Sequence, residues 1–230
     1  KQYKELCGFN KKTGKVCKKV YENIQEIKDD INNFRDNLYH IIRTKNGYEQ
    51  DITIQNFKHV FNNDIDNYEF IKYDRESEII DINKTLTTKP KKHVIIFVKE
   101  MLRCAKTLIK IYGGVRYDRF TKIPDDTVTN QGLIGRDCGY DNNGISICYT
   151  NIDSIVKYQK LWESKFEDKT IKWKSQTTKY INGTLSGRNT FNDPRNYIGF
   201  SISSDDSDEL REPVIKKFKT QEEAKDYYNK

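Results

Sequence analysis

Long apolar runs are missing from this sequence of 230 residues. No stretch approaches the roughly 18 apolar residues that a membrane-spanning helix needs, so we expect no membrane span. No signal peptide is visible, and the chain begins at Lys1 rather than at methionine, which suggests that it starts inside a longer protein. We therefore expect an intracellular protein of the cytoplasm, the nucleus or, if its origin is viral, the virion.

Two common kinds of site are also missing. The glycine-rich stretch 131–144 contains no Gly-Lys-Ser/Thr, so it does not form a phosphate loop of that type. The three histidines, His40, His59 and His93, show no His-x-x-x-His spacing, so no histidine metal site is predicted.

Proline, tryptophan, methionine and alanine are scarce, whereas asparagine, lysine and isoleucine are abundant, a composition typical of an AT-rich genome. The 15 tyrosines and 11 phenylalanines can still build a core. The net charge of +7 is uneven, because residues 1–20 and 88–122 are basic and residues 21–87 are acidic. Such blocks favour a polyanion or an acidic partner, but they could equally pack against each other.

The most regular pattern predicts a helix over Lys91–Tyr112, with Gly113-Gly114 as its end. Its apolar side chains would lie on one arc, and a row of cations would lie opposite, where it could follow phosphates. The plain alternative is a solvated face on a core helix. The cations of this row are Lys99, Arg103, Lys106 and Lys110.

The remaining patterns predict an α+β fold of amphipathic helices with small antiparallel sheets. Residues 21–43 predict a helix through Ile24, Ile27 and Ile31, which packs on its own domain or forms a dimer seam. Residues 153–166 predict another helix, and Asn182-Gly183 a hairpin. We expect three regions: 1–87 with a basic cysteine hairpin and an acidic helical part, 88–180 around the basic helix, and 181–230 as a ββα unit.

The ββα unit ends in Phe218-Lys-Thr-Gln-Glu-Glu-Ala224, followed by Tyr227-Tyr228. This ending resembles that of an Apetala-type DNA-binding domain, and the resemblance implies that the strands around Tyr197–Ser203 and Lys216–Lys219 face DNA. The family's reading strand, rich in arginine and tryptophan, has no counterpart here. The stretch from Cys7 to Lys18 is similar to short basic cysteine motifs of large DNA virus proteins, which implies a giant-virus origin.

Four of the five cysteines form two loops of equal length, each opening with Cys-Gly-aromatic. If the loops meet, their thiolates would form a tetrahedral, structural zinc site. Free thiols and a disulfide across each loop are the alternatives. The zinc ligands would be Cys7, Cys17, Cys138 and Cys148.

Three functions remain open. The first is a non-catalytic protein that binds DNA or RNA, with Arg116, Arg119, Lys11 and Lys12 assisting the row of cations. The second is a virion or assembly protein that docks on partner subunits. The third is a metal-dependent nuclease, in which Asp125, Asp126 and Glu163 would hold the metal.

Overall fold

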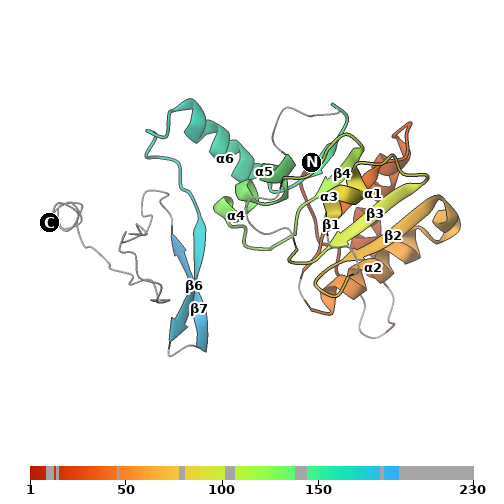
Figure 1. Ribbon diagram of the computed structural model, residues 1–230. Coiled ribbons are helices and arrows are strands. Elements are labelled where there is room, and N and C mark those ends of the chain that lie inside the picture. The colour runs from red at the N-terminus through yellow and green to blue at the C-terminus, as the bar shows by residue number, and fades with distance from the viewer. Residues whose placement is uncertain are drawn as a thin grey trace, which may run out of the picture.

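The structure, a computed structural model, shows a five-stranded sheet with helices on both sides, from which a long helix and a two-stranded hairpin extend (Figure 1). It describes residues 1–8, 13, 16–45, 47–77, 81–101, 107–137, 144–181 and 184–191.

The five strands are all parallel, in the order β2-β3-β1-β4-β5. They are β1 (Tyr39–Arg43), β2 (Tyr68–Tyr73), β3 (His93–Val98), β4 (Gly113–Tyr117) and β5 (Ile147–Tyr149). The predicted mixture of helices and strands is confirmed, but the prediction of antiparallel sheets is wrong for this sheet. Only the hairpin of β6 (Ser175–Ile181) and β7 (Thr184–Phe191) is antiparallel among the described strands, as predicted from Asn182-Gly183.

Helices lie between the strands along the chain. They are α1 (Lys18–Asn32), α2 (Glu49–Val60), the 3-10 helix η1 (Asn62–Asn67), α3 (Ile82–Leu86), α4 (Asp126–Gln131), α5 (Leu133–Asp137) and α6 (Ile152–Glu163). None of these described helices is long and apolar enough to cross a membrane.

Each face of the sheet has its own hydrophobic core. On one face, Ile24 of α1 and Phe57 of α2 pack with Ile42 of β1. On the other face, Leu86 of α3 and Leu133 at the start of α5 belong to the same core as Ile41 of β1. Because strand side chains alternate between faces, both cores draw on the same strands.

The helix predicted over Lys91–Tyr112 is wrong. Residues 93–98 form β3, which lies between β1 and β2, and residues 102–106 lie outside the described part of the chain. The sequence Val94-Ile-Ile-Phe-Val98 explains the difference, because a continuous run of β-branched and aromatic residues suits a parallel strand buried on both faces.

The helix predicted over residues 21–43 is correct only for its first part. Ile24, Ile27 and Ile31 lie on α1 and are buried in this chain's own core, which agrees with the predicted packing of this helix on its own domain. Residues 39–43 instead form β1. The helix predicted over 153–166 corresponds to α6. The ββα unit falls almost entirely on residues outside the described part of the chain.

Candidate ligand site at the carboxyl edge of the sheet

All five strands are parallel, so their carboxyl ends lie at one edge of the sheet. From β1 the chain continues to β2, towards one end of the strand order. From β4 it continues to β5, towards the opposite end. Open α/β sheets bind their ligands outside the carboxyl ends of the strands, next to such a reversal of direction. The topology therefore selects this edge as the first place to look for a site.

A cation stands at or just beyond the carboxyl end of each of the first four strands. Arg43 is the last residue of β1, and Lys99 directly follows β3. Arg75 follows β2 by two residues, and Arg119 follows β4 by two residues. We call these four residues the edge cations. They come from four separate segments of the sequence, and the order of the strands brings these segments to one edge.

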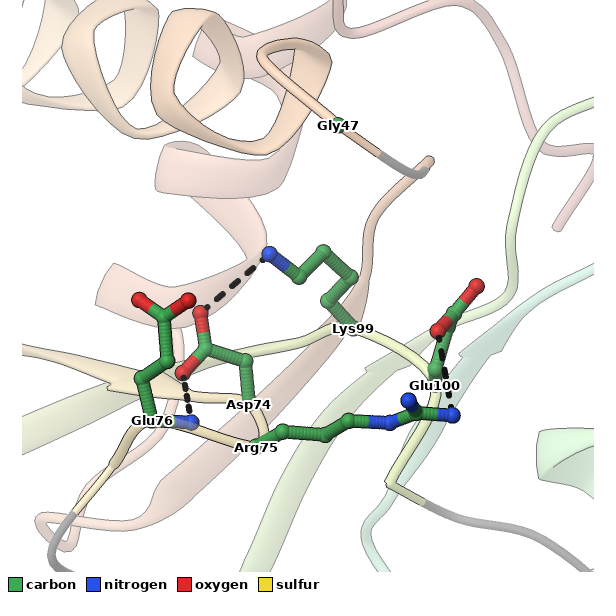
Figure 2. Close-up of a pocket in the computed structure, with 6 residues that line it drawn as sticks. All are labelled: Gly47, Asp74, Arg75, Glu76, Lys99 and Glu100. Carbon is green, nitrogen blue, oxygen red and sulfur yellow. Dashed lines mark hydrogen bonds and ion pairs between the residues drawn. The ribbon is translucent and has the colours of Figure 1, made fainter.

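A cavity of about 210 Å³ opens at this edge, beside the ends of β2 and β3. Figure 2 shows two of the edge cations in its lining. Lys99 Nζ lies 3.4 Å from Asp74 Oδ2, and Arg75 Nη2 lies 3.9 Å from Glu100 Oε2. Glu76 and Gly47 complete the lining.

Asp74 is the buried acid of this cavity. Burial alone would raise the pKa of its carboxyl group, but the backbone N–H of Glu76 and the ammonium groups of Lys99 and Lys72 outweigh burial and lower that pKa. Lys72 Nζ lies 3.4 Å from the same Oδ2 atom as Lys99 Nζ. Asp74 therefore stays ionised at neutral pH and is shared by two lysines.

A second ion pair joins the ends of β1 and β4. Arg43 Nη1 donates a hydrogen bond of 2.7 Å to Asp118 Oδ1, and both side chains are largely buried. Burial raises the pKa of Asp118, although Arg43 counteracts the rise. A Cβ atom at Gly132 would lie 2.9 Å from Arg43 Nη1, so only glycine lets the chain pass this close. This pair fixes the strand ends and leaves Arg43 little freedom to bind a ligand.

The row of cations predicted on one helix is not formed. Lys99 lies in the cavity, whereas Lys110 is buried and its Nζ donates to the carbonyl oxygen of Asp137 at 3.0 Å. Arg116 of β4 is fully buried and binds the carboxylate of Asp137 at 3.2 Å. Lys110 and Arg116 therefore stabilise the fold. Four predicted binding residues, Arg103, Lys106, Lys11 and Lys12, lie outside the described part of the chain.

Of the predicted binding residues, Lys99 and Arg119 lie at the carboxyl edge. Arg43 and Arg75 were missed. The signal that could have found them is a cation placed at or directly after a short strand-like run, as in Ile41-Ile42-Arg43.

The predicted zinc ligands are only partly described. Cys7 directly precedes Gly8. The carbonyl oxygen of Gly8 accepts a hydrogen bond of 3.4 Å from the backbone N–H of Cys17. Cys148 lies in β5, and Cys138 is outside the described residues. Burial raises the pKa of the Cys7 thiol to about 11. Within the described ranges, no three metal-binding side chains form a group, and the four-cysteine zinc site stays a prediction.

The carboxylates predicted for a nuclease all have structural partners. Asp125 caps the start of α4 by accepting the backbone N–H of Val128 at 2.8 Å. Asp126 is buried, and its carboxylate accepts bonds from Ser154, from Lys157 and from the backbone N–H of Lys174. Asp126 thereby ties α4 to α6 and to the segment before β6. Glu163 accepts a hydrogen bond of 2.8 Å from Gln159 on the surface of α6.

Comparison with known proteins gives no relative. No protein-family model matches the chain, no curated protein is significantly similar in sequence, and no solved structure matches its fold at a significant level.

Proposed function

We propose that this chain is a nucleic-acid-binding α/β domain that holds phosphate groups at the carboxyl edge of its parallel sheet. The observation that carries the proposal is that two of the edge cations, Arg75 and Lys99, line a cavity of about 210 Å³ at that edge. A net charge of +7 adds a long-range attraction for a polyanion.

Arg75 is the edge cation best placed to contact a ligand. Its side chain is 69% exposed, and in the cavity wall its Nη2 lies 3.9 Å from Glu100 Oε2. Exposed pairs of this kind contribute little to stability. A phosphate group can accept two hydrogen bonds from one guanidinium, so it competes well with Glu100.

Lys99 can also be released without leaving a buried charge alone. Asp74 is held by both Lys72 and Lys99, at 3.4 Å each. If Lys99 turns towards a phosphate group, Asp74 keeps its contact with Lys72, which it shares with Asp51 at 3.1 Å. The acidic lining of the cavity therefore does not prevent the two cations from meeting a polyanion.

Binding of a labelled DNA oligonucleotide, measured across a range of salt concentrations, tests the proposal. We expect affinity to fall steeply with salt, and the double substitution Arg75→Ala/Lys99→Ala to lower the slope of log affinity against log salt by about one for each lost phosphate contact. Lys92→Ala is the matched control, because Lys92 is exposed and precedes β3 at the opposite edge of the sheet.

Lys92→Ala should change the slope of log affinity against log salt less than Arg75→Ala or Lys99→Ala alone. If the double variant and the control bind alike, the carboxyl edge is not the site. If the unaltered protein shows no salt-dependent binding, the chain does not bind nucleic acid, and docking on protein subunits becomes the better explanation of its charge.

A further inference from the structure

Three exposed aromatic side chains form a cluster on α6 and on the turn that follows it. Trp162 is 66% exposed, Phe166 50% and Tyr158 41%, which is unusual for side chains of this size. The ring centroids of Trp162 and Phe166 are 6.1 Å apart, and those of Tyr158 and Phe166 are 6.2 Å apart. We call these three residues the aromatic cluster.

The backbone at the end of α6 holds this cluster in place. Phe166 N–H donates to the carbonyl oxygen of Leu161 at 2.7 Å, and Lys165 N–H donates to that of Trp162 at 2.9 Å. This pair of bonds is a Schellman motif, which usually has glycine where Lys165 stands. Lys165 and Phe166 take left-handed φ angles of 52° and 63°. The turn folds Phe166 back against the rings of α6 at some conformational cost.

The cluster also has a buried support. Trp173 is only 6% exposed, and its ring centroid lies 6.2 Å from that of Tyr158. Trp173 Nε1 donates to Thr127 Oγ1 of α4 at 3.0 Å. The exposed rings therefore project from a fixed base.

Four lysines lie close to the aromatic cluster in the sequence, on α6 and in the segment that follows it. The side chains are exposed, and none forms an ion pair with another residue in the part of the chain that the structure describes, in contrast to most of the edge cations. They are Lys160, Lys165, Lys169 and Lys172. The neighbouring acids have local roles, since Glu163 accepts from Gln159 and Asp168 from Thr170. Lys160 also helps to lower the pKa of the Asp168 carboxyl group. The surface thus combines flat apolar rings with exposed lysines.

We propose that the aromatic cluster and its lysines form a binding platform for single-stranded nucleic acid, with bases stacked on the rings and phosphates beside the lysines. Stacking on aromatic side chains inside a cationic surface is the general way in which proteins hold unpaired bases. A duplex keeps its base faces covered by neighbouring pairs, so the platform should favour single strands.

The platform deepens the proposed function and rests on it. α6 begins three residues after the carboxyl end of β5, so it starts at the same edge of the sheet as Lys99 and Arg75. Figure 1 shows α6 extending outward from the sheet. A nucleic-acid strand that contacts both sites would pass the carboxyl ends of β1 and β4, which lie between β3 and β5.

Intrinsic fluorescence gives a direct test. The chain has two tryptophans, of which Trp162 is exposed and Trp173 is buried. In the full chain, and equally in the Trp173→Phe variant, we expect a single-stranded oligothymidylate to quench the emission of Trp162, and a duplex of the same length to quench it much less. We expect Trp162→Ala to weaken single-strand binding by about tenfold and to leave duplex binding unchanged.

The controls separate this inference from the function on which it rests. Ile111→Ala removes another exposed apolar side chain, before β4 at the opposite edge, and should have no effect. Trp162→Phe keeps a stacking ring and should lose less affinity than Trp162→Ala. Arg75→Ala/Lys99→Ala should weaken binding of single strands and duplexes alike.

If Trp162→Ala leaves single-strand affinity unchanged while the Arg75/Lys99 variant reduces it, the platform is refuted and the proposed function stands. If the unaltered protein binds no nucleic acid, both fail. If Trp162→Ala abolishes self-association and leaves nucleic-acid binding intact, the aromatic cluster is a protein interface.

Discussion

His40 is buried and His93 is half-buried, and their neutral rings form a hydrogen-bonded pair. The backbone N–H of Val115 donates to His40 Nδ1 at 2.9 Å, so the proton of His40 resides on Nε2 and is donated to His93 Nδ1 at 3.0 Å. Burial lowers the pKa of His40 well below its ordinary value, and the nearby Arg116 and His93 act in the same direction. Burial also lowers the pKa of His93. Both rings are neutral in the folded protein at neutral pH.

This pair predicts that the folded state loses stability in mild acid. In the unfolded chain each histidine takes up a proton near pH 6.5, whereas the folded state resists protonation. The stabilisation is therefore complete above about pH 6.5 and declines below it, by up to about 1.4 kcal/mol per pH unit for each histidine. Urea unfolding at several pH values between 7.5 and 5 measures the free energy of unfolding.

Substitution identifies the group responsible. We expect His40→Gln to lose much of the pH dependence, because a glutamine side chain can accept the Val115 N–H without titrating. His59→Gln, on the exposed side of α2, should keep it. An unaltered protein whose stability stays flat from pH 7.5 to 5 would contradict the assignment.

Arg116 is a core residue in spite of its charge. Its Nε binds the carboxylate of Asp137 at 3.2 Å, and its Nη1 donates to the carbonyl oxygen of Tyr39 at 3.1 Å. A Cβ at Gly113 would lie 2.5 Å from Arg116 Nη2, so glycine provides the room that the guanidinium fills. Burial raises the pKa of Asp137, and Arg116 counteracts the rise.

We predict that Arg116→Met destabilises the fold by about 3 to 5 kcal/mol, because the largely buried carboxylate of Asp137 loses its ion pair with Arg116 and keeps only the weaker attraction of Lys110. The double variant Arg116→Met/Asp137→Asn should recover part of the loss, since it removes both charges. Denaturant unfolding measures both values. A loss below about 0.5 kcal/mol in the single variant would show that Arg116 is a surface residue, as the sequence prediction had it.

At the scale of the element, β3 shows why the helix predicted over Lys91–Tyr112 was wrong. The spacing of Val94, Phe97 and Met101 fits one face of a helix, but it also fits a strand with both faces buried. A short apolar run is ambiguous in its periodicity, and the neighbouring strands decide its conformation. By contrast, Ile24, Ile27 and Ile31 are separated by polar residues, and the helix predicted from them is present as α1.

The candidate site was only half predictable for a related reason. Lys99 and Arg119 were selected because they are cations in a basic stretch, whereas Arg75 lies in an acidic stretch and was passed over. What makes these residues neighbours is the strand order β2-β3-β1-β4-β5, which depends on pairings between distant segments. The aromatic cluster was also missed, because Trp162 and Phe166 fall within the helix predicted over residues 153–166, and the pattern does not show which of its aromatic side chains are exposed.

At the scale of the whole molecule, the sheet joins regions that the sequence pattern predicts to be separate. β1 and β2 come from residues 1–87, but they do not pair with each other. The neighbours of β1 are β3 and β4, and the neighbour of β2 is β3. Both strands that the structure describes in the first region therefore depend on the second region for their backbone hydrogen bonds.

We predict from this arrangement that neither fragment 1–87 nor fragment 88–230 folds alone. The first fragment keeps α1 and α2, but its two strands have lost their partners, and the second keeps the β4–β5 pair without the central strand β1. Unpaired backbone groups cannot be buried at low cost, so the hydrophobic cores on both faces cannot close. Circular dichroism with urea titration of each fragment, and of the mixture, measures this.

Because residues 87 and 88 are exposed, a break between them should not itself prevent assembly, and the mixture should recover a cooperative transition. Cooperative unfolding of fragment 1–87 alone would show that it is an independent domain and that β1 gains its stability without β3 and β4.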